Sequence, residues 1–356
     1  MPREKPRADE IAIEMMSVCE DETEVEQDPR ELYEEEMKEQ QQIDCSKQQK
    51  EVVAIEELEK RNINKHFFSI QPNTQIPVIS SNYIAPVDTS RLLVLIGKTK
   101  ATYPIMKMFS LSVLAGMLLS VGGLLSITIG KGIPSSDIGI QKIVFGFFNS
   151  VGLNLVVLCG GELFTSNCAF LIPGFMEGAY SRWLFFKTHF VVYFGNLVGS
   201  IFVSTYFGKL LGSFESPMYL SAVKQIGETK VAMNWGRALL SGIGCNWLVC
   251  CAVYFSASAK DLLSKLVVIS FLVLTFASLE FENCVGNMFL LSLSHMYGGN
   301  FTLGQWILNN LIPVSIGNFI GGTFLLGIPL WYVHVSNVYN IPFLDPLYQQ
   351  SQAKTQ

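Results

Sequence analysis

The chain has 356 residues, of which 49% are hydrophobic and only 15% are charged, well below the roughly 25% charged residues of soluble proteins. Its net charge of −5 divides unevenly. Residues 1–60 hold 20 acids and 8 bases, a balance of −12, whereas residues 61–356 hold 10 acids and 17 bases, a balance of +7. This division excludes a nucleic-acid-binding protein that acts through overall basicity, and it argues against a soluble enzyme.

The N-terminal part, residues 1–103, is predicted to be an acidic, largely disordered cytoplasmic head and linker. Its Glu-rich stretches offer no apolar face on which a core can form. The run of Pro, Asn, Ser and Thr from Ile70 to Val87 is typical of an extended linker. We expect a solvated tail, and the alternative is a regulatory or partner-binding tail.

Long gaps without charge divide the rest of the chain. No acid, lysine or arginine occurs between Lys107 and Lys131, or between Glu282 and Asp345. An apolar helix needs about 20 residues to cross the hydrocarbon core of a membrane. The gaps therefore predict six membrane helices, at residues 104–130, 140–160, 184–211, 235–258, 262–280 and 306–335. They form a transmembrane domain over residues 104–335, followed by a short cytoplasmic tail at residues 336–356.

Basic residues that flank the predicted spans indicate an orientation. Eight lysines and arginines lie on the side of the N-terminus and six on the opposite side, and basic residues favour the cytoplasmic side of a membrane. Since the number of spans is even, both termini are expected in the cytoplasm. The protein is thus predicted to be a multi-pass membrane protein, with the plasma membrane as the expected location.

The spans contain an internal repeat. The Gly-Asn pair at Gly195 recurs at Gly317, and the segment that begins at Asn167 resembles the one at Asn287. The intervals from the Asn to the Gly are 28 and 30 residues. Because each half holds three spans, the halves would cross the membrane in opposite directions, and such repeats place a substrate site near the midplane. The alternative is chance similarity between Gly-rich membrane helices.

The second helix of each half is predicted to be broken where its polar residues fall. Glu162 lies in the first break, at residues 160–167, and Glu282 in the second, at residues 278–287. Unwound backbone is tolerated at membrane depth only where protein or a water-filled cavity satisfies it, and a carboxylate there needs a partner. Glu162 and Glu282 therefore mark either the lining of a solute pathway or hydrogen bonds that hold the broken helices together.

Five short motifs, in this order, resemble signatures of the formate/nitrite transporter family. They are Glu-Leu-Phe-Thr-Ser-Asn at residues 162–167, Val-Tyr-Phe-Gly-Asn at 192–196, Asn-Trp-Leu-Val-Cys at 246–250, Phe-Glu at 281–282 with Asn-Met at 287–288, and Asn-Leu-Ile-Pro-Val at 310–314. The resemblance covers residues 98–335 and implies an all-α, aquaporin-like protomer with broken second and fifth helices. It further implies a homopentamer embedded in membrane lipid, and a transporter rather than an enzyme.

The resemblance also implies a substrate and a pathway. The substrate is a small monovalent anion, such as formate, acetate, lactate or nitrite, carried with a proton. The residues expected along the pathway are Lys230, Thr165, Asn283, Glu282, Asn287, Glu162 and Asn167. The residues expected in an apolar constriction are Leu163, Phe164 and Val249, with Phe276 in a constriction on the other side of the centre.

Lys230, expected in the loop before the fourth span, would attract the anion into the outer vestibule. A lone cation can concentrate an anion by its field alone. The alternative is a lysine at the membrane interface that extends its ammonium to lipid headgroups.

Asn283 departs from the family pattern, which has a histidine at this position. Asparagine does not titrate, so it cannot pass a proton to the permeating anion. Desolvation in an apolar constriction raises the pKa of the anion, and a proton from bulk water can then neutralise it. The alternatives are a non-coupled anion channel and a non-conducting membrane scaffold that acts through its acidic head. No metal, cofactor or nucleic acid is expected.

Overall fold

The computed structural model describes residues 82–133 and 135–336, so the predictions for residues 1–81 and for the tail from residue 337 lie outside the described residues. The described residues belong to one compact unit, Ser80–Gln356. They are helical, and within these two ranges the only pairing of β type is an isolated antiparallel bridge between Tyr83 and Ala259.

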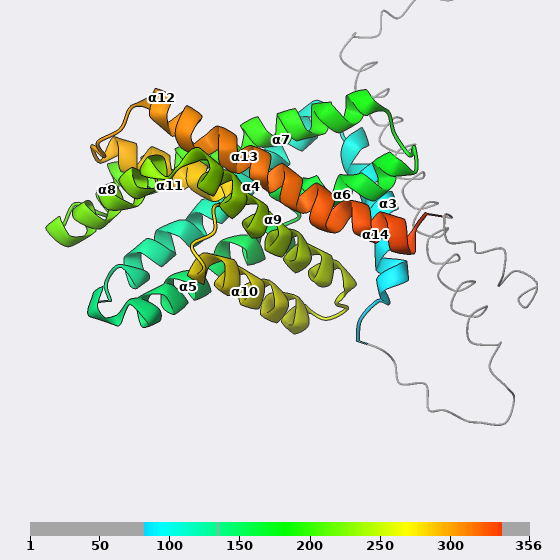
Figure 1. The fold of residues 1–356 in the computed structure, drawn as a ribbon, viewed down its shortest axis with the longest axis horizontal. Helices are drawn as coiled ribbons and strands as arrows, with labels where there is room; N and C mark the ends of the chain where they lie inside the picture. Colours follow the sequence, from blue (N-terminus) through cyan, green and yellow to red (C-terminus); the bar gives the residue numbers. More distant parts are fainter. Residues whose placement is uncertain (1–81, 134, 337–356) are drawn as a thin grey trace, which may run out of the picture. The chain divides into compact units, whose positions relative to one another are not determined.

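The first half of the described chain contains five α-helices and two short helical segments (Figure 1). They are α3 (Pro86–Thr102), α4 (Ile105–Gly130), η1 (Ser135–Asp137), α5 (Ile138–Leu158), α6 (Phe164–Met176), α7 (Arg182–Val203) and η2 (Ser204–Leu210). The second half contains α8 (Pro217–Ala232), α9 (Trp235–Ser258), α10 (Leu262–Ser278) and α11 (Cys284–Met296). A last helical stretch is made of α12 (Leu303–Gln305), η3 (Trp306–Leu311), α13 (Ile312–Gly322), η4 (Thr323–Gly327) and α14 (Ile328–His334).

The apolar helices fall where the charge-free gaps predicted them. Among the described residues, five helical stretches are long and apolar enough to cross a membrane: α4, α5, α7 with η2, α9, and the stretch from α12 to α14. The remaining predicted span, residues 262–280, corresponds to α10, which has 17 residues and is followed, after a break, by α11. The all-α membrane fold is therefore confirmed.

Two amphipathic helices occupy segments that the charge pattern assigned to a head and to a loop. Helix α3 lies in the region predicted as head and linker, and α8 precedes the fourth predicted span. Each buries a narrow stripe at a spacing of four residues, Leu93, Gly97 and Ala101 in α3 and Val223, Gly227 and Val231 in α8. Because lysines and other charged residues interrupt the apolar residues of both helices, a search for long charge-free gaps does not detect them.

The internal repeat is visible in how the helices pack. Helix α4 packs against α5 and α7, and in the same way α9 packs against α10 and α13, while α3 lies on α6 and α8 lies on α11 (Figure 1). Ser150 on α5 and Ser270 on α10, which are 120 residues apart, hydrogen-bond to each other at 3.1 Å. Equivalent residues of two halves meet only at the axis that relates them, so this contact supports the predicted repeat.

Each broken helix turns at a residue with a left-handed backbone. These residues are Gly160, with φ of 66°, and Glu280, with φ of 58°. They are 120 residues apart, as are Phe164 and Cys284, where the chain becomes helical again. A residue other than glycine in this conformation costs roughly 1–2 kcal/mol. Glycine makes the turn in the first half, so the turn itself does not require the side chain of Glu280.

Small residues allow the closest helix contacts in both halves. A Cβ atom at Gly199 would lie 2.1 Å from the carbonyl oxygen of Val113, and one at Gly321 would lie 2.2 Å from that of Ile243. These distances are far inside van der Waals contact, and the obstructing atoms are backbone, which cannot rotate away. The α4–α7 and α9–α13 contacts therefore both depend on glycine.

We expect Gly199→Ala and Gly321→Ala each to lower the free energy of unfolding by about 1–3 kcal/mol, because the added methyl group forces the two backbones apart. Gly139→Ala in α5 is the control, since its Cβ meets no atom within 4 Å. Thermal unfolding of the purified protein in detergent measures all three. An unchanged melting temperature for both interface variants would contradict the predicted close packing.

Candidate functional site

Two asparagines tie the broken helices to their neighbours in the same way. The Asn196 Oδ1 accepts a hydrogen bond from the backbone N–H of Phe164 at 2.9 Å, and its Nδ2 donates to the carbonyl of Glu162 at 2.8 Å. In the second half the Asn318 Oδ1 accepts from Cys284 N–H at 2.8 Å, and its Nδ2 donates to the carbonyl of Glu282 at 2.9 Å. Both side chains thus satisfy backbone groups that the breaks leave without helical partners.

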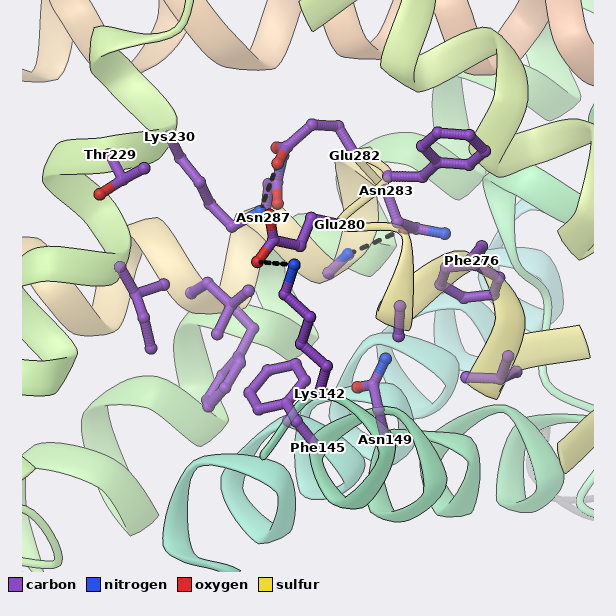
Figure 2. A pocket seen from close by; sticks show the side chains of 18 of the residues that line it. Lys142, Phe145, Asn149, Thr229, Lys230, Phe276, Glu280, Glu282, Asn283 and Asn287 are labelled. Carbon is purple, nitrogen blue, oxygen red and sulfur yellow. Dashed lines mark hydrogen bonds and ion pairs between the residues drawn. The ribbon is translucent and has the colours of Figure 1, made fainter. Parts of the chain in front are cut away.

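The Glu282 carboxylate is buried in a set of donors at the second break. It accepts hydrogen bonds from the Lys230 Nζ at 2.7 Å and the Asn287 Nδ2 at 2.6 Å (Figure 2). The Asn310 Nδ2 donates a third at 3.2 Å. Only 4% of the carboxylate side chain and 18% of the lysine side chain are exposed. A buried carboxylate with a cation and two amide donors is stable where an isolated one is not.

The first break carries the same arrangement around Glu162. Its carboxylate accepts from the Lys100 Nζ at 2.8 Å and from the Asn167 Nδ2 at 3.0 Å. Lys100, on α3, was missed as a functional residue by the sequence analysis. It precedes Lys230 by 130 residues, the same offset that relates Val113 to Ile243, so extending the repeat upstream of the spans would have found it.

A cavity of about 460 Å³ opens beside the second break. Seven of the predicted site residues line it: Lys230, Glu282, Asn283, Asn287, Leu163, Val249 and Phe276. The lining also includes Lys142, Asn149 and Glu280, which Figure 2 labels, and Lys131. The cavity therefore has charged walls near Lys230 and Lys142 and an apolar part formed by leucine, valine and phenylalanine.

Asn283 has a clear local role. Its Oδ1 accepts hydrogen bonds from the backbone N–H groups of Val285 and Gly286, both at 3.0 Å, so it is the N-cap of α11. Asparagine is among the best residues at this position. The side chain lies on the cavity wall beside Glu282 and brings no titratable group to it (Figure 2).

Lys230 is placed differently from the sequence prediction. It lies in the last turn of helix α8 and not in a loop. The helix fixes its direction, and the ion pair with Glu282 draws its ammonium into the protein. This contact is not the one expected of a lysine that extends toward lipid headgroups.

The remaining predicted residues lie outside the lining of this cavity. Phe164 is buried, with its ring centroid 5.8 Å from that of His189 and 5.0 Å from that of Tyr193. Thr165 is fully buried, and its carbonyl accepts from the Asn246 Nδ2 at 3.1 Å.

Apolar helices with two re-entrant breaks, buried ion pairs at both and a cavity with a charged wall define a membrane channel or transporter. The family model described as formate/nitrite transporter matches residues 88–332. The chain belongs to the formate/nitrite transporter family, whose members are transporters and channels rather than enzymes.

Individual relatives agree with this assignment. The chain is 32% identical over 273 residues to a probable formate transporter of Methanothermobacter thermautotrophicus, covering 72% of this chain and 99% of that protein. Among solved structures, it resembles an FNT family ion channel with a TM-score of 0.63 and 28% identity, over 69% of this chain and 98% of that one. It also resembles a pentameric formate channel with formate bound, with a TM-score of 0.57 and 30% identity, over 65% of this chain and 98% of that one.

The two ion pairs on the cavity wall differ in burial, which gives a matched test. Lys230→Met leaves the buried Glu282 carboxylate without its cation and should lower the free energy of unfolding by about 3 kcal/mol. Lys142→Met breaks the exposed pair with Glu280, whose side chains are 37% and 69% exposed, and should cost less than about 1 kcal/mol.

Unfolding of both variants by denaturant in detergent gives the comparison. A second change, Glu282→Gln, should recover part of the loss in Lys230→Met, because it removes the stranded charge. Equal costs for the two single variants would contradict the assignment of the Lys230–Glu282 pair as the buried one.

Proposed function

We propose that this protein carries small monovalent anions across the membrane, with formate as the first candidate, and that each anion crosses together with a proton. The observation that carries the proposal is the cavity beside the second break. Its charged side chains are three lysines and two glutamates, and this excess of positive charge favours an anion. The inner part of the cavity is apolar. Related monocarboxylates, such as acetate and lactate, and nitrite fit the same charge and size class.

The charged wall and the apolar lining act in sequence. The lysines raise the local concentration of anions by their field. A bare carboxylate cannot enter the apolar part defined by Leu163, Val249 and Phe276, because its desolvation is costly. As the anion loses water its pKa rises, so a proton from the aqueous vestibule neutralises it, and the neutral acid passes. No side chain has to donate that proton, which is compatible with Asn283 at this position.

The first break repeats the ion pair of the second. Lys100, Glu162 and Asn167 repeat the geometry of Lys230, Glu282 and Asn287. We therefore propose a pathway with a lysine near each mouth. Phe164 and Thr165 belong to the half of the pathway beyond the central apolar region.

The assembly and the location are proposed from the relatives and from the sequence. The solved formate channel that the chain resembles is pentameric, and this supports a homopentamer in which each protomer has its own pathway. Large exposed apolar side chains, such as Trp183, Phe190 and Leu240, are available to contact lipid or neighbouring protomers. We propose the plasma membrane as the location, with both termini in the cytoplasm.

Uptake of labelled formate by liposomes containing the purified protein tests the function. We expect uptake to increase as the external pH falls at constant formate, because a proton accompanies each anion. Acetate, lactate and nitrite, assayed in parallel, define the substrate range. Uptake that is independent of the proton gradient would favour a non-coupled anion channel. Absence of flux for every anion would favour a membrane scaffold.

Asn283 allows a test of the neutral pathway. Asn283→Asp keeps an N-cap for α11 but adds a negative charge beside the apolar lining, so formate uptake at pH 7 should fall by about tenfold or more. Asn283→Ser keeps the cap and remains neutral, and it should retain most of the uptake. Both variants should melt within a few degrees of wild type. Equal uptake by the two variants would show that the anion does not pass Asn283.

A further inference from the structure

The cavity has two ion pairs at different depths. Lys142 on α5 and Glu280 in the second break lie 3.2 Å apart, with side chains 37% and 69% exposed. Lys230 and Glu282 lie 2.7 Å apart, with side chains 18% and 4% exposed. The first pair is thus the outer one and the second pair the inner one (Figure 2).

Lys131 adds a cation to this wall without a matching acid. It follows α4 directly, lines the cavity and is partly buried. No ion pair joins it to any carboxylate in residues 82–133 or 135–336. Burial lowers the pKa of its ammonium, and the field of Glu280 acts in the opposite direction. A partly buried ammonium with no carboxylate partner can be satisfied by an anion from solution.

Glu280 adopts a left-handed backbone conformation that is unfavourable for a residue with a side chain. It has a φ of 58°, and its counterpart in the other half is Gly160, with a φ of 66°. Glycine suits this turn, as the first half demonstrates. The carboxylate of Glu280 is therefore not explained by the turn, but it lies on the cavity wall, in contact with Lys142 and within electrostatic range of Lys131.

We infer that Lys131 and Lys142 form an outer anion site at the mouth of the cavity, and that Glu280 sets its strength by neutralising Lys142. The site rests on the proposed function, since it delivers anions to the Lys230 region. Its ligand is a small monovalent anion, a carboxylate or nitrite, held by charge alone. Two ammonium groups present no fixed fork of donors, so the site attracts anions without distinguishing strongly among them.

The test uses the full-length protein in liposomes, with the initial rate of formate uptake measured against formate concentration at low ionic strength. Lys131→Gln should raise the KM about three- to tenfold with little change in kcat, because it weakens capture and leaves the inner pathway intact. Glu280→Gly should lower the KM by a similar factor, because it frees Lys142. Glu280→Gly combined with Lys142→Gln should return the KM to near the wild-type value.

Two further measurements separate charge from structure. Glu280→Gln removes the charge without adding a glycine, and it should lower the KM in the same direction. The KM differences among all variants should shrink at about 0.5 M salt, which screens fields but would not repair a misfolded protein. Lys224→Gln, on α8 and outside the cavity lining, loses one positive charge on the same helix as Lys230 and should leave the KM unchanged.

The outcomes distinguish this site from the function itself. A wild-type protein that takes up no anion overturns the proposed function. A wild-type protein that transports formate, with an unchanged KM in Lys131→Gln, overturns the outer site. A KM that is unchanged in both Glu280→Gly and Glu280→Gln overturns the role of Glu280.

Discussion

Backbone polar groups inside a membrane must find partners within the protein, and this requirement governs the two breaks on which the site is built. An unwound segment in hydrocarbon is unstable unless something replaces its lost helical hydrogen bonds. Asn196 and Asn318 do so, each binding a carbonyl inside a break and the first N–H of the helix that follows it. With the backbone satisfied in this way, the two short helices α6 and α11 can end near the centre of the protein and leave room for a pathway.

The buried carboxylates lie in the same breaks, so the residues that stabilise the fold also belong to the proposed pathway. Glu162 and Glu282 are held by lysines from α3 and α8, the amphipathic helices outside the long spans. Each lysine thereby fastens its helix to a break and places a cation near a mouth of the proposed pathway. From the sequence alone, two roles are open to these carboxylates. The hydrogen bonds support the structural role directly. The cavity beside Glu282 supports the other role, the lining of a solute pathway, for this residue.

Much of the fold could be predicted because it follows from local composition. Long apolar stretches identify spans, and polar residues inside them identify breaks. The prediction of helices from charge-free gaps failed for α3 and α8. Both helices contain lysines, and they were therefore assigned to a linker and a loop. The prediction also missed Lys100, whose partner Glu162 is 62 residues away in sequence.

The sequence by itself determined the spans, the breaks, the internal repeat and the family, because each of these depends on the composition or the motifs of short, continuous segments. Only the tertiary structure decided which side chains share the cavity, that Asn283 caps α11, and that Lys131 forms no ion pair with a described carboxylate. These facts depend on the directions of side chains from helices far apart in the chain. Those directions follow from how the helices pack on one another, which no single stretch of sequence contains.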